Sequence, residues 1–233
     1  MPFTPPANPF NGQADKNADH GITHPATTSV AVIMAAGASR RFGADDKRLA
    51  TLPDGRHLLA ATVALVTTAF PALRVVLRED DDPQALGLSA DTPIIRTAHA
   101  SEGLGASIRD AFIALQGDDD LIDMQAAAIL LGDMPALRPE TLEALQRQIT
   151  RQCIVRPVQA GRPGHPVLFG RAFWSELAAL GGKNRYNEEG ENLKDEGARS
   201  VIRANREYAI ELAVDDPGIH LDIDHSTDLR RLS

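Results

Sequence analysis

Cysteine is almost absent from this 233-residue chain, and aromatic residues make up only 4% of it. The single cysteine, Cys153, excludes an internal disulfide framework and has no CxxC partner for a zinc or redox motif, so we expect a reducing, cytoplasmic compartment. Because free cysteine is among the most buried residue types, Cys153 is predicted to be a small core residue. Long apolar runs are also missing: residues 126–131 are followed by Gly132 and Asp133, far short of the roughly 18 apolar residues of a membrane span. We therefore expect a soluble protein with no membrane partner.

An excess of positive charge is missing too, since 24 Lys and Arg residues face 32 Asp and Glu residues and the formal net charge is −8. This balance argues against nucleic acid or an anionic membrane as the main partner. A site for an anion must then be assembled locally. One segment has the necessary concentration of charge: residues 30–50, VAVIMAAGASRRFGADDKRLA, place Arg40, Arg41, Lys47 and Arg48 after a glycine turn.

The first 29 residues contain five prolines among scattered Asn, Asp and Gly residues. They lack the apolar stretch of about 7 to 15 residues that a secretory signal requires. We predict a disordered tail over residues 1–29 and one domain over residues 30–233, which is long enough to build a sizeable core.

From residue 30 onward, apolar runs of strand length alternate with segments of helical period. This alternation is typical of an α/β fold in which a mostly parallel, Rossmann-like sheet is flanked by helices. The expected strands are residues 30–34, 73–77, 93–95, 126–131, 153–158, 166–169 and 209–214. The expected helices are residues 59–70, one after Gly103, one with Pro139 in its first turn, and residues 172–180, 198–205 and 227–232. Residues 181–197 are rich in glycine and charge, which predicts a long loop.

The glycine turn after the first strand is a phosphate site in principle, because unpaired backbone N–H groups and the helix dipole both favour an anion there. The two common nucleotide fingerprints fail, however: Phe42 interrupts GxxxxGK[ST], and Ser39 replaces the second glycine of GxGxxG. The stretch MAAGASRRFGADDK instead resembles the signature loop LAAGxSxRMGxxxK of the MobA-like nucleotidyltransferases. That resemblance implies a single-domain, nucleotide-diphospho-sugar-transferase-like architecture and a loop that binds a nucleoside triphosphate. The positions that match are Ala35, Ala36, Gly37, Ser39, Arg41, Gly43 and Lys47.

Within this loop, Arg41 and Lys47 are the candidates to contact the phosphates and to stabilise the charge that develops during catalysis. Arg40 and Arg48 are weaker candidates, and the alternative for both is a side chain that faces water.

A carboxylate follows the strand predicted at residues 126–131, in Gly132-Asp133-Met134-Pro135. In open α/β sheets ligands bind beyond the carboxyl ends of strands, and Mg²⁺ bound to a triphosphate takes one or two protein carboxylates. The segment resembles the family's GDxP element, which implies that Asp133 is a catalytic metal ligand. Near the C-terminus, DIDHSTDL resembles the closing segment DIDTPxDL, which implies a second metal ligand at Asp224, with Asp222 in reserve; the alternative for either is a cap of the last helix. The acidic runs at residues 80–82 and 118–120 are predicted to be solvated loops.

Three further segments are candidates to choose the substrates. In SEGLGAS, either Gly103, Gly105 and Ser107 contact the nucleotide base, as the resemblance implies, or they only begin a helix. The segment AGRPGHPV resembles the GxxGHPV loop of the branch that cytidylylates molybdopterin, so Gly164 and His165 are candidates to bind that substrate; the alternative for His165 is a structural hydrogen bond to a carbonyl group. DEGARSVI resembles that branch's GDxGARxL segment, which implies that Arg199 contacts the substrate phosphate, although residues 183–194 form a longer loop than the pattern leads us to expect.

The resemblance extends over residues 30–232, and its motifs occur in the family's order. Within the family, LAAG rather than LAGG accompanies cytidine nucleotides, and this chain has MAAG. The resemblance therefore implies Mg²⁺-dependent transfer of CMP from CTP to the phosphate of molybdopterin, with a molybdoenzyme as client. The alternatives are GTP as donor, a sugar or polyol phosphate as acceptor, an NAD(P)H-dependent oxidoreductase, and a non-catalytic escort of the cofactor.

Overall fold

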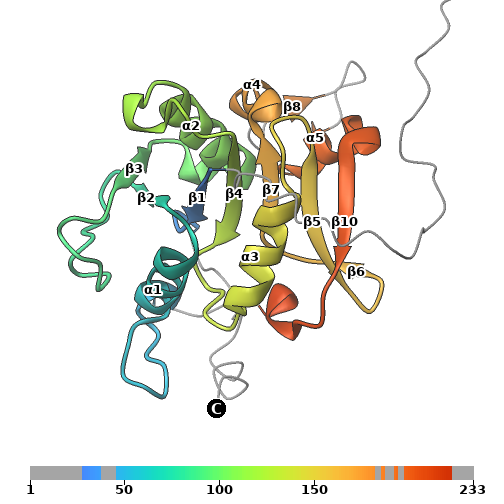
Figure 1. Cartoon of the computed structure of the whole chain (residues 1–233). Helices are drawn as coiled ribbons and strands as arrows, with labels where there is room; N and C mark the ends of the chain where they lie inside the picture. The colour runs from blue at the N-terminus through green and yellow to red at the C-terminus, as the bar shows by residue number, and fades with distance from the viewer. Residues whose placement is uncertain (1–27, 38–45, 182–184, 187–191, 194–196, 222–233) are drawn as a thin grey trace, which may run out of the picture.

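A computed structural model describes residues 28–37, 46–181, 185–186, 192–193 and 197–221. They form a mostly parallel sheet flanked by helices, which confirms the predicted α/β class (Figure 1). Several predictions lie outside the described residues: the tail up to residue 27, the last helix, and the candidate site residues Ser39, Arg41, Asp222 and Asp224.

The main sheet has eight strands, and seven of them follow the order β10-β5-β7-β4-β1-β2-β3, while β6 pairs with β5. β7 runs antiparallel to both of its neighbours and β6 runs antiparallel to β5, whereas the other pairings are parallel. The strand bounds are β1 (Ser29–Met34), β2 (Ala72–Arg78), β3 (Ile94–Thr97), β4 (Ala126–Leu131), β5 (Ile154–Gln159), β6 (Arg162–Pro163), β7 (Val167–Gly170) and β10 (Ala209–Ala213). Each predicted strand is therefore present, with its ends shifted by at most two residues.

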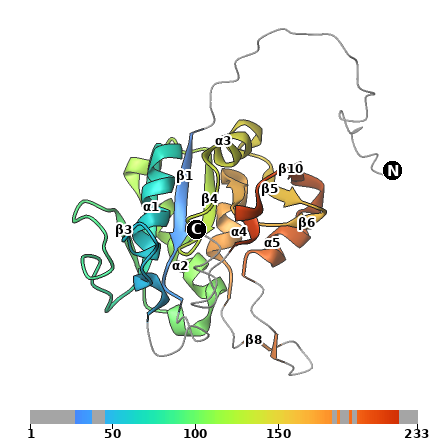
Figure 2. The same cartoon turned by 90° about the horizontal axis from the view of Figure 1, so that it is seen from below.

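The α-helices also follow the predicted order, and they are α1 (Leu58–Ala69), α2 (Leu104–Gln116), α3 (Pro139–Gln148), α4 (Trp174–Ala178) and α5 (Arg199–Ala204). Short 3-10 helices lie between these elements: η1 (Lys47–Leu49), η2 (Ala100–Glu102), η3 (Asp119–Leu121), η4 (Arg171–Phe173), η5 (Arg206–Tyr208) and η6 (Pro217–His220). The helix predicted at residues 172–180 is thus divided between η4 and α4. The predicted long loop contains β8 (Arg185–Tyr186) and β9 (Asn192–Leu193), which form a separate two-stranded sheet (Figure 2).

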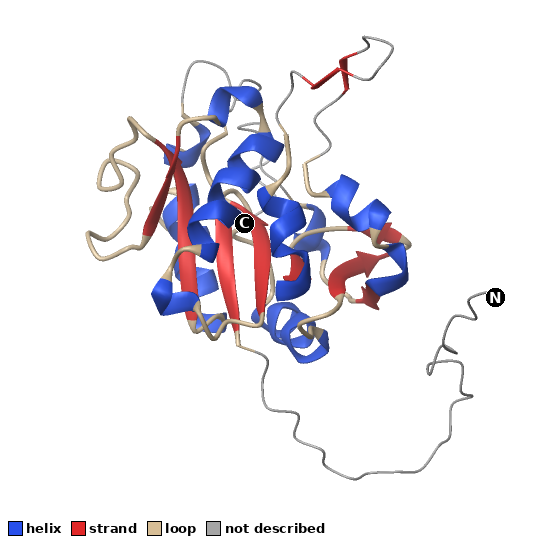
Figure 3. Ribbon diagram, turned by 90° about the horizontal axis from the view of Figure 1, so that it is seen from above, coloured by secondary structure: helices blue, strands red, loops and turns tan. Residues whose placement is uncertain are grey.

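Alternate residues of β1 supply two different cores, as the period of a strand requires. Ala31 and Ile33 pack with residues of α1 and α3, while Val32 and Met34 pack with residues of α2 and α4 on the other side of the sheet. Figure 3 shows helices on both sides of the strands. Because both faces are covered, β1 is buried over its whole length. Cys153 is buried, as predicted.

The strand order changes direction at β1, and this point positions the site. From β1 the chain proceeds outward to β2 and β3, whereas β4 lies on the other side of β1. The two strands end together, because Met34 pairs with Leu131 in the parallel register. A ligand of an open α/β sheet binds at such a switch point, beyond the carboxyl ends of the strands. Within the described part of the chain, no helix is long and apolar enough to cross a membrane.

Candidate active site

The two loops that leave β1 and β4 are in direct contact. The Gly132 amide donates a hydrogen bond to the Met34 carbonyl (3.0 Å), and the Ala35 amide donates to Val76 on β2 (3.0 Å). A Cβ atom at position 132 would lie 3.1 Å from Ala35 Cβ and 3.1 Å from Leu59 Cδ1. Glycine at this position therefore allows the loop after β4 to approach the loop after β1.

Lys47 and Asp133, which the sequence placed in separate motifs, form an ion pair through Nζ and Oδ2. Lys47 is the first residue of η1, and Asp133 follows β4 after one glycine. The lysine side chain is 10% exposed and the aspartate side chain 18%, so the pair is largely but not completely buried. The structure thus brings the predicted phosphate ligand and the predicted metal ligand together at the switch point of the sheet.

The chemistry of this pair fits a divalent cation bound with a phosphate group. Mg²⁺ prefers oxygen ligands and combines one or two carboxylates with phosphate oxygens and water, and Asp133 offers one such carboxylate. Lysine acts as a point charge for phosphate. Among the described residues no group of three or more His, Cys, Asp and Glu side chains is placed to hold a metal ion. The second ligand predicted at Asp224 or Asp222 lies outside the described residues.

Arg48 is buried and does not face water, so the alternative interpretation of this side chain is wrong. The prediction that residues 80–82 form a solvated loop is also wrong for Asp81, whose side chain is buried. The Arg48 guanidinium forms a bidentate ion pair with Asp81 (2.5 and 2.7 Å) and a second one with Asp46. The side chains of Arg48 and Asp81 are 8% and 9% exposed. The residue beside Lys47 is therefore a buried structural cation.

The pKa values of Arg48, Asp81 and Asp46 are shifted by their burial and by their contacts with one another. Burial alone would raise the pKa of Asp81, but hydrogen bonds from the Arg48 guanidinium and from the Arg78 backbone amide outweigh it and lower the pKa below the ordinary value of 3.8. The pKa of Asp46 is lowered by the same balance, in which burial is offset mainly by Arg48. Burial alone would lower the pKa of Arg48, yet its two carboxylate partners raise it. The cluster is fully ionised at neutral pH.

The predicted base-contacting loop forms the start of α2. Gly103 is the N-cap residue and has φ +119°, a conformation that favours glycine. The Ser107 hydroxyl donates to the Gly103 carbonyl (3.4 Å), and both Gly105 and Ser107 are buried. These contacts agree with the helix-start interpretation. The loop nevertheless lies at the same edge of the sheet as Lys47 and Asp133, because it follows the parallel strand β3.

The predicted substrate loop packs against the last described segment of the chain. The Gly164 amide donates to Pro157 on β5 (2.9 Å), and the His165 amide donates to Ile219 in η6 (3.0 Å). A Cβ atom at position 164 would lie 2.5 Å from the Ile219 carbonyl oxygen, so this approach requires glycine. The peptide bond between His165 and Pro166 is cis. The GHP segment is therefore adjacent to the chain that leads to Asp222.

Arg199 is exposed at the first position of α5. The structure leaves its predicted contact with the substrate phosphate untested.

Two polar clusters were missed by the sequence reasoning. One is the network of Arg48 with Asp81. The other lies after β3, where Asp110 accepts hydrogen bonds from the Thr97 hydroxyl (2.6 Å) and pairs with His99 Nδ1 (2.8 Å). In addition, Asp118 is not simply solvated, because it pairs with Arg74 on β2 (2.6 Å). No motif signals these pairs, since each joins residues from different elements.

The fold and these contacts define a class of protein: an α/β domain with a glycine-containing loop after its first strand and a lysine–aspartate pair at the switch point of the sheet. A family model described as the MobA-like NTP transferase domain matches residues 31–209, and the chain belongs to this family. The predicted family, the MobA-like nucleotidyltransferases, is confirmed.

Solved structures agree over most of the chain. The crystal structure of Rv0371c from Mycobacterium tuberculosis H37Rv superposes with a TM-score of 0.71 and 29% identity, covering 89% of this chain and 97% of that one. A structure of Rv0371c in complex with manganese superposes with a TM-score of 0.65 and 27% identity, covering 89% and 98%. Molybdopterin-guanine dinucleotide biosynthesis protein A from Archaeoglobus fulgidus, at 18% identity and a TM-score of 0.59 over 87% of this chain and 95% of that one, shares the fold.

A curated relative covers a smaller part of the chain. The bifunctional protein GlmU of Sphingopyxis alaskensis is 29% identical over 143 residues, which are 60% of this chain. The match spans only 30% of the length of that protein.

Proposed function

We propose that the protein transfers CMP from CTP to the phosphate group of molybdopterin and releases pyrophosphate. The observation that carries the proposal is the ion pair between Lys47 and Asp133, because it joins the two family motifs at the switch point. The choice of CTP is supported by the MAAG sequence, and the choice of acceptor by the GHPV loop, which resembles the cytidylylating branch. A molybdoenzyme that receives the product completes the proposal.

In the proposed reaction a phosphate oxygen of the acceptor attacks the α-phosphorus of CTP. A new bond forms between this oxygen and the α-phosphorus, and the bond from the α-phosphorus to the bridging oxygen breaks, so that pyrophosphate leaves. No protein nucleophile is needed, and the protein contributes position and charge.

Lys47 and Arg41 neutralise phosphate charge, and Ser39 on the same loop binds the nucleotide. Asp133 would hold Mg²⁺ together with Asp224, with Asp222 in reserve. When bound, Mg²⁺ supplies charge neutralisation for the departing pyrophosphate. Before substrates arrive, Lys47 and Asp133 balance each other, and a triphosphate that enters with a divalent cation gives each of them a new partner of opposite charge.

We assign the two substrates to opposite sides of Asp133, and the strand order supports this assignment. The first loop, through Ala35, Ala36 and Gly37, and the start of α2 belong to the β1-β2-β3 half of the sheet. Nucleotide contacts are therefore assigned to this half, with Gly103, Gly105 and Ser107 near the base. The GHP loop follows β6 and lies at the end of β5, on the other side of β4. Gly164, His165 and Arg199 are accordingly assigned to the acceptor.

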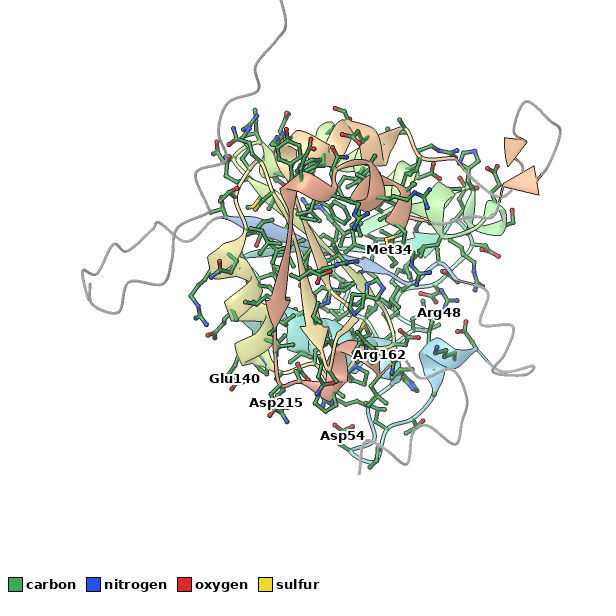
Figure 4. All side chains as sticks on the ribbon, turned by 90° about the vertical axis from the view of Figure 1, so that its right-hand side faces the viewer. Met34, Arg48, Asp54, Glu140, Arg162 and Asp215 are labelled. Atoms are coloured by element: carbon green, nitrogen blue, oxygen red, sulfur yellow. The ribbon has the colours of Figure 1, made fainter. Side chains whose placement is uncertain are left out.

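The test measures the melting temperature with Mg²⁺ and, in turn, CTP, GTP, ATP, UTP and NADPH. A ligand present at 100 times its dissociation constant adds about 2.7 kcal/mol to the free energy of unfolding. Each kcal/mol corresponds to roughly 2 to 4 °C for a domain of this size. We expect CTP alone to stabilise the wild type, and Asp133→Ala to remove the Mg²⁺-dependent part of the shift. Asp54→Ala is the matched control, because Asp54 is exposed on a surface turn (Figure 4).

Turnover is measured next, as pyrophosphate released from CTP in the presence of molybdopterin. We expect Asp133→Ala to lower it by orders of magnitude while Asp54→Ala retains it. Stabilisation by GTP would favour guanylyl transfer, and stabilisation by NADPH would favour an oxidoreductase. Binding of CTP without release of pyrophosphate would indicate a non-catalytic escort.

A further inference from the structure

Three consecutive carbonyl groups of the first loop are held by two arginine side chains. Arg48 Nη1 donates to the Ala35 carbonyl (3.0 Å). Arg78, the last residue of β2, donates through Nε to Ala36 (3.0 Å) and through Nη2 to Gly37 (2.5 Å). Figure 4 shows Arg48 on the side of the molecule where β1 ends at Met34. Neither arginine was selected by the family motifs for this task.

These hydrogen bonds determine which way the loop's amide groups face. A trans peptide is planar and its N–H group points opposite to its C=O group. Fixing the carbonyls of Ala35 and Ala36 toward the arginines therefore turns the amides of Ala36 and Gly37 in the opposite directions. In the described part of the chain, neither amide donates to a protein acceptor. Backbone N–H groups that lack a protein acceptor are donors for phosphate oxygens.

The arginines are themselves fixed by a chain of contacts that extends to β3. Asp81 binds Arg48 through both oxygens and also accepts from the Arg78 amide (2.9 Å). Arg96 on β3 donates to the carbonyls of Arg78 (2.7 Å) and Asp81 (2.6 Å). Asp46, the other partner of Arg48, caps η1, in which Lys47 lies. One network therefore supports both the loop carbonyls and the segment that carries Lys47.

We infer that Arg48, Arg78 and Asp81 are positioning residues that hold the first loop in the conformation that binds the triphosphate. This inference rests on the proposed function, in which that loop binds the phosphates of the nucleotide. The N–H groups of the two arginines donate to backbone carbonyls of the loop and to the carboxylates of Asp46 and Asp81. The arginines therefore influence triphosphate binding by positioning the loop. Without the network, the carbonyls of Ala35, Ala36 and Gly37 lose these side-chain donors, and we expect the entropy cost of ordering the peptide groups on binding to weaken affinity by roughly 10- to 100-fold.

Arg78 is the best residue to test, because its side chain is 30% exposed and its loss leaves little buried charge. The variants are Arg78→Met, the conservative Arg78→Lys, and the control Arg74→Met on the same strand, whose ion pair with Asp118 lies away from the loop. Dissociation constants are measured by calorimetry for Mg²⁺ with CTP and for Mg²⁺ with inorganic tripolyphosphate. We expect Arg78→Met to weaken both about 10- to 100-fold, Arg78→Lys to recover part of the loss, and Arg74→Met to bind like the wild type.

The tripolyphosphate measurement separates this inference from the proposed function. Equal tripolyphosphate affinity in the wild type and Arg78→Met would overturn the inference, and so would a wild type that does not bind tripolyphosphate. A wild type that binds tripolyphosphate but not CTP would overturn the proposed nucleotide, while a loss of tripolyphosphate affinity in Arg78→Met would still support the positioning role. Asp81→Asn gives a second test, because it removes the charge that orients Arg48 and should weaken both ligands in the same proportion.

Discussion

The ion pair between Lys47 and Asp133 gives the sharpest quantitative prediction, because it joins two loops that the chain brings together from different strands. The perturbation is a double-mutant cycle of Lys47→Met, Asp133→Asn and the double variant, measured without nucleotide or metal. Each single change removes one charge and leaves the other in a site with little access to water. The double variant removes both charges, so the cycle isolates their interaction.

The expected magnitude follows from the exposure of the two side chains, 10% for Lys47 and 18% for Asp133. Fully exposed pairs contribute about 0.2 to 1 kcal/mol, and breaking a fully buried pair by removing one partner costs about 3 to 5 kcal/mol. This pair lies between those limits, so we expect a coupling free energy of about 1 to 3 kcal/mol. The losses of unfolding free energy in the two single variants should then add up to more than the loss in the double variant.

Urea unfolding of the four proteins at neutral pH measures this coupling. If the unfolding free energy depends on urea concentration with the same slope in all four proteins, the variants share one unfolding transition. A coupling below about 0.5 kcal/mol, which is within the range of ordinary additivity, would refute the reasoning that the pair holds the two loops together before substrates bind.

Two further predictions concern the backbone and the pH dependence of stability. Gly218→Ala should lower the free energy of unfolding by about 1 to 3 kcal/mol, since its Cβ would lie 2.3 Å from the Ala136 carbonyl oxygen. Gly37→Ala should leave the free energy of unfolding unchanged, because its Cβ meets no described atom within 4 Å. Urea titrations that give the same loss of unfolding free energy for both variants would contradict this contrast. Because the pKa of Asp81 is lowered from 3.8, its stabilising contribution is complete above about pH 4 and is lost as pH falls through the lower folded value. Acid unfolding below pH 4 should therefore be steeper for the wild type than for Asp81→Asn, and parallel curves would show that the ion pair does not stabilise the fold.

The fold was largely predictable because its signals are local. Buried strands such as Ala126–Leu131 are continuous apolar runs, and α3 begins where Pro139 and Glu140 suit a first helical turn. The division of the helix predicted at residues 172–180 was not predictable, because η4 is set by tertiary contacts: the Arg171 guanidinium donates to the carbonyls of Leu121 and Met124.

The candidate site was predictable where a motif carried it and not elsewhere. Lys47 and Asp133 each follow an apolar strand in a recognisable segment, and strand pairing brings them together. The partnership of Arg48 with Asp81 has no such signal, because the two residues are 33 positions apart and Asp81 lies in an acidic run that reads as a solvated loop. Only the three-dimensional path of the chain after β2 places one carboxylate of that run against a buried arginine.

The different fates of Lys47 and Arg48 follow from the geometry of η1. Successive residues of a 3-10 helix point about 120° apart around its axis, so two neighbouring cations address different surroundings. Lys47 reaches Asp133 at the switch point, and Arg48 reaches Asp46, Asp81 and the carbonyl of Ala35. Arg48 therefore neutralises two carboxylates of an acidic chain, one of them adjacent to Lys47 in the sequence. In our proposal, Lys47 remains available to exchange its partner for the triphosphate because its neighbour in the sequence neutralises Asp46 and Asp81.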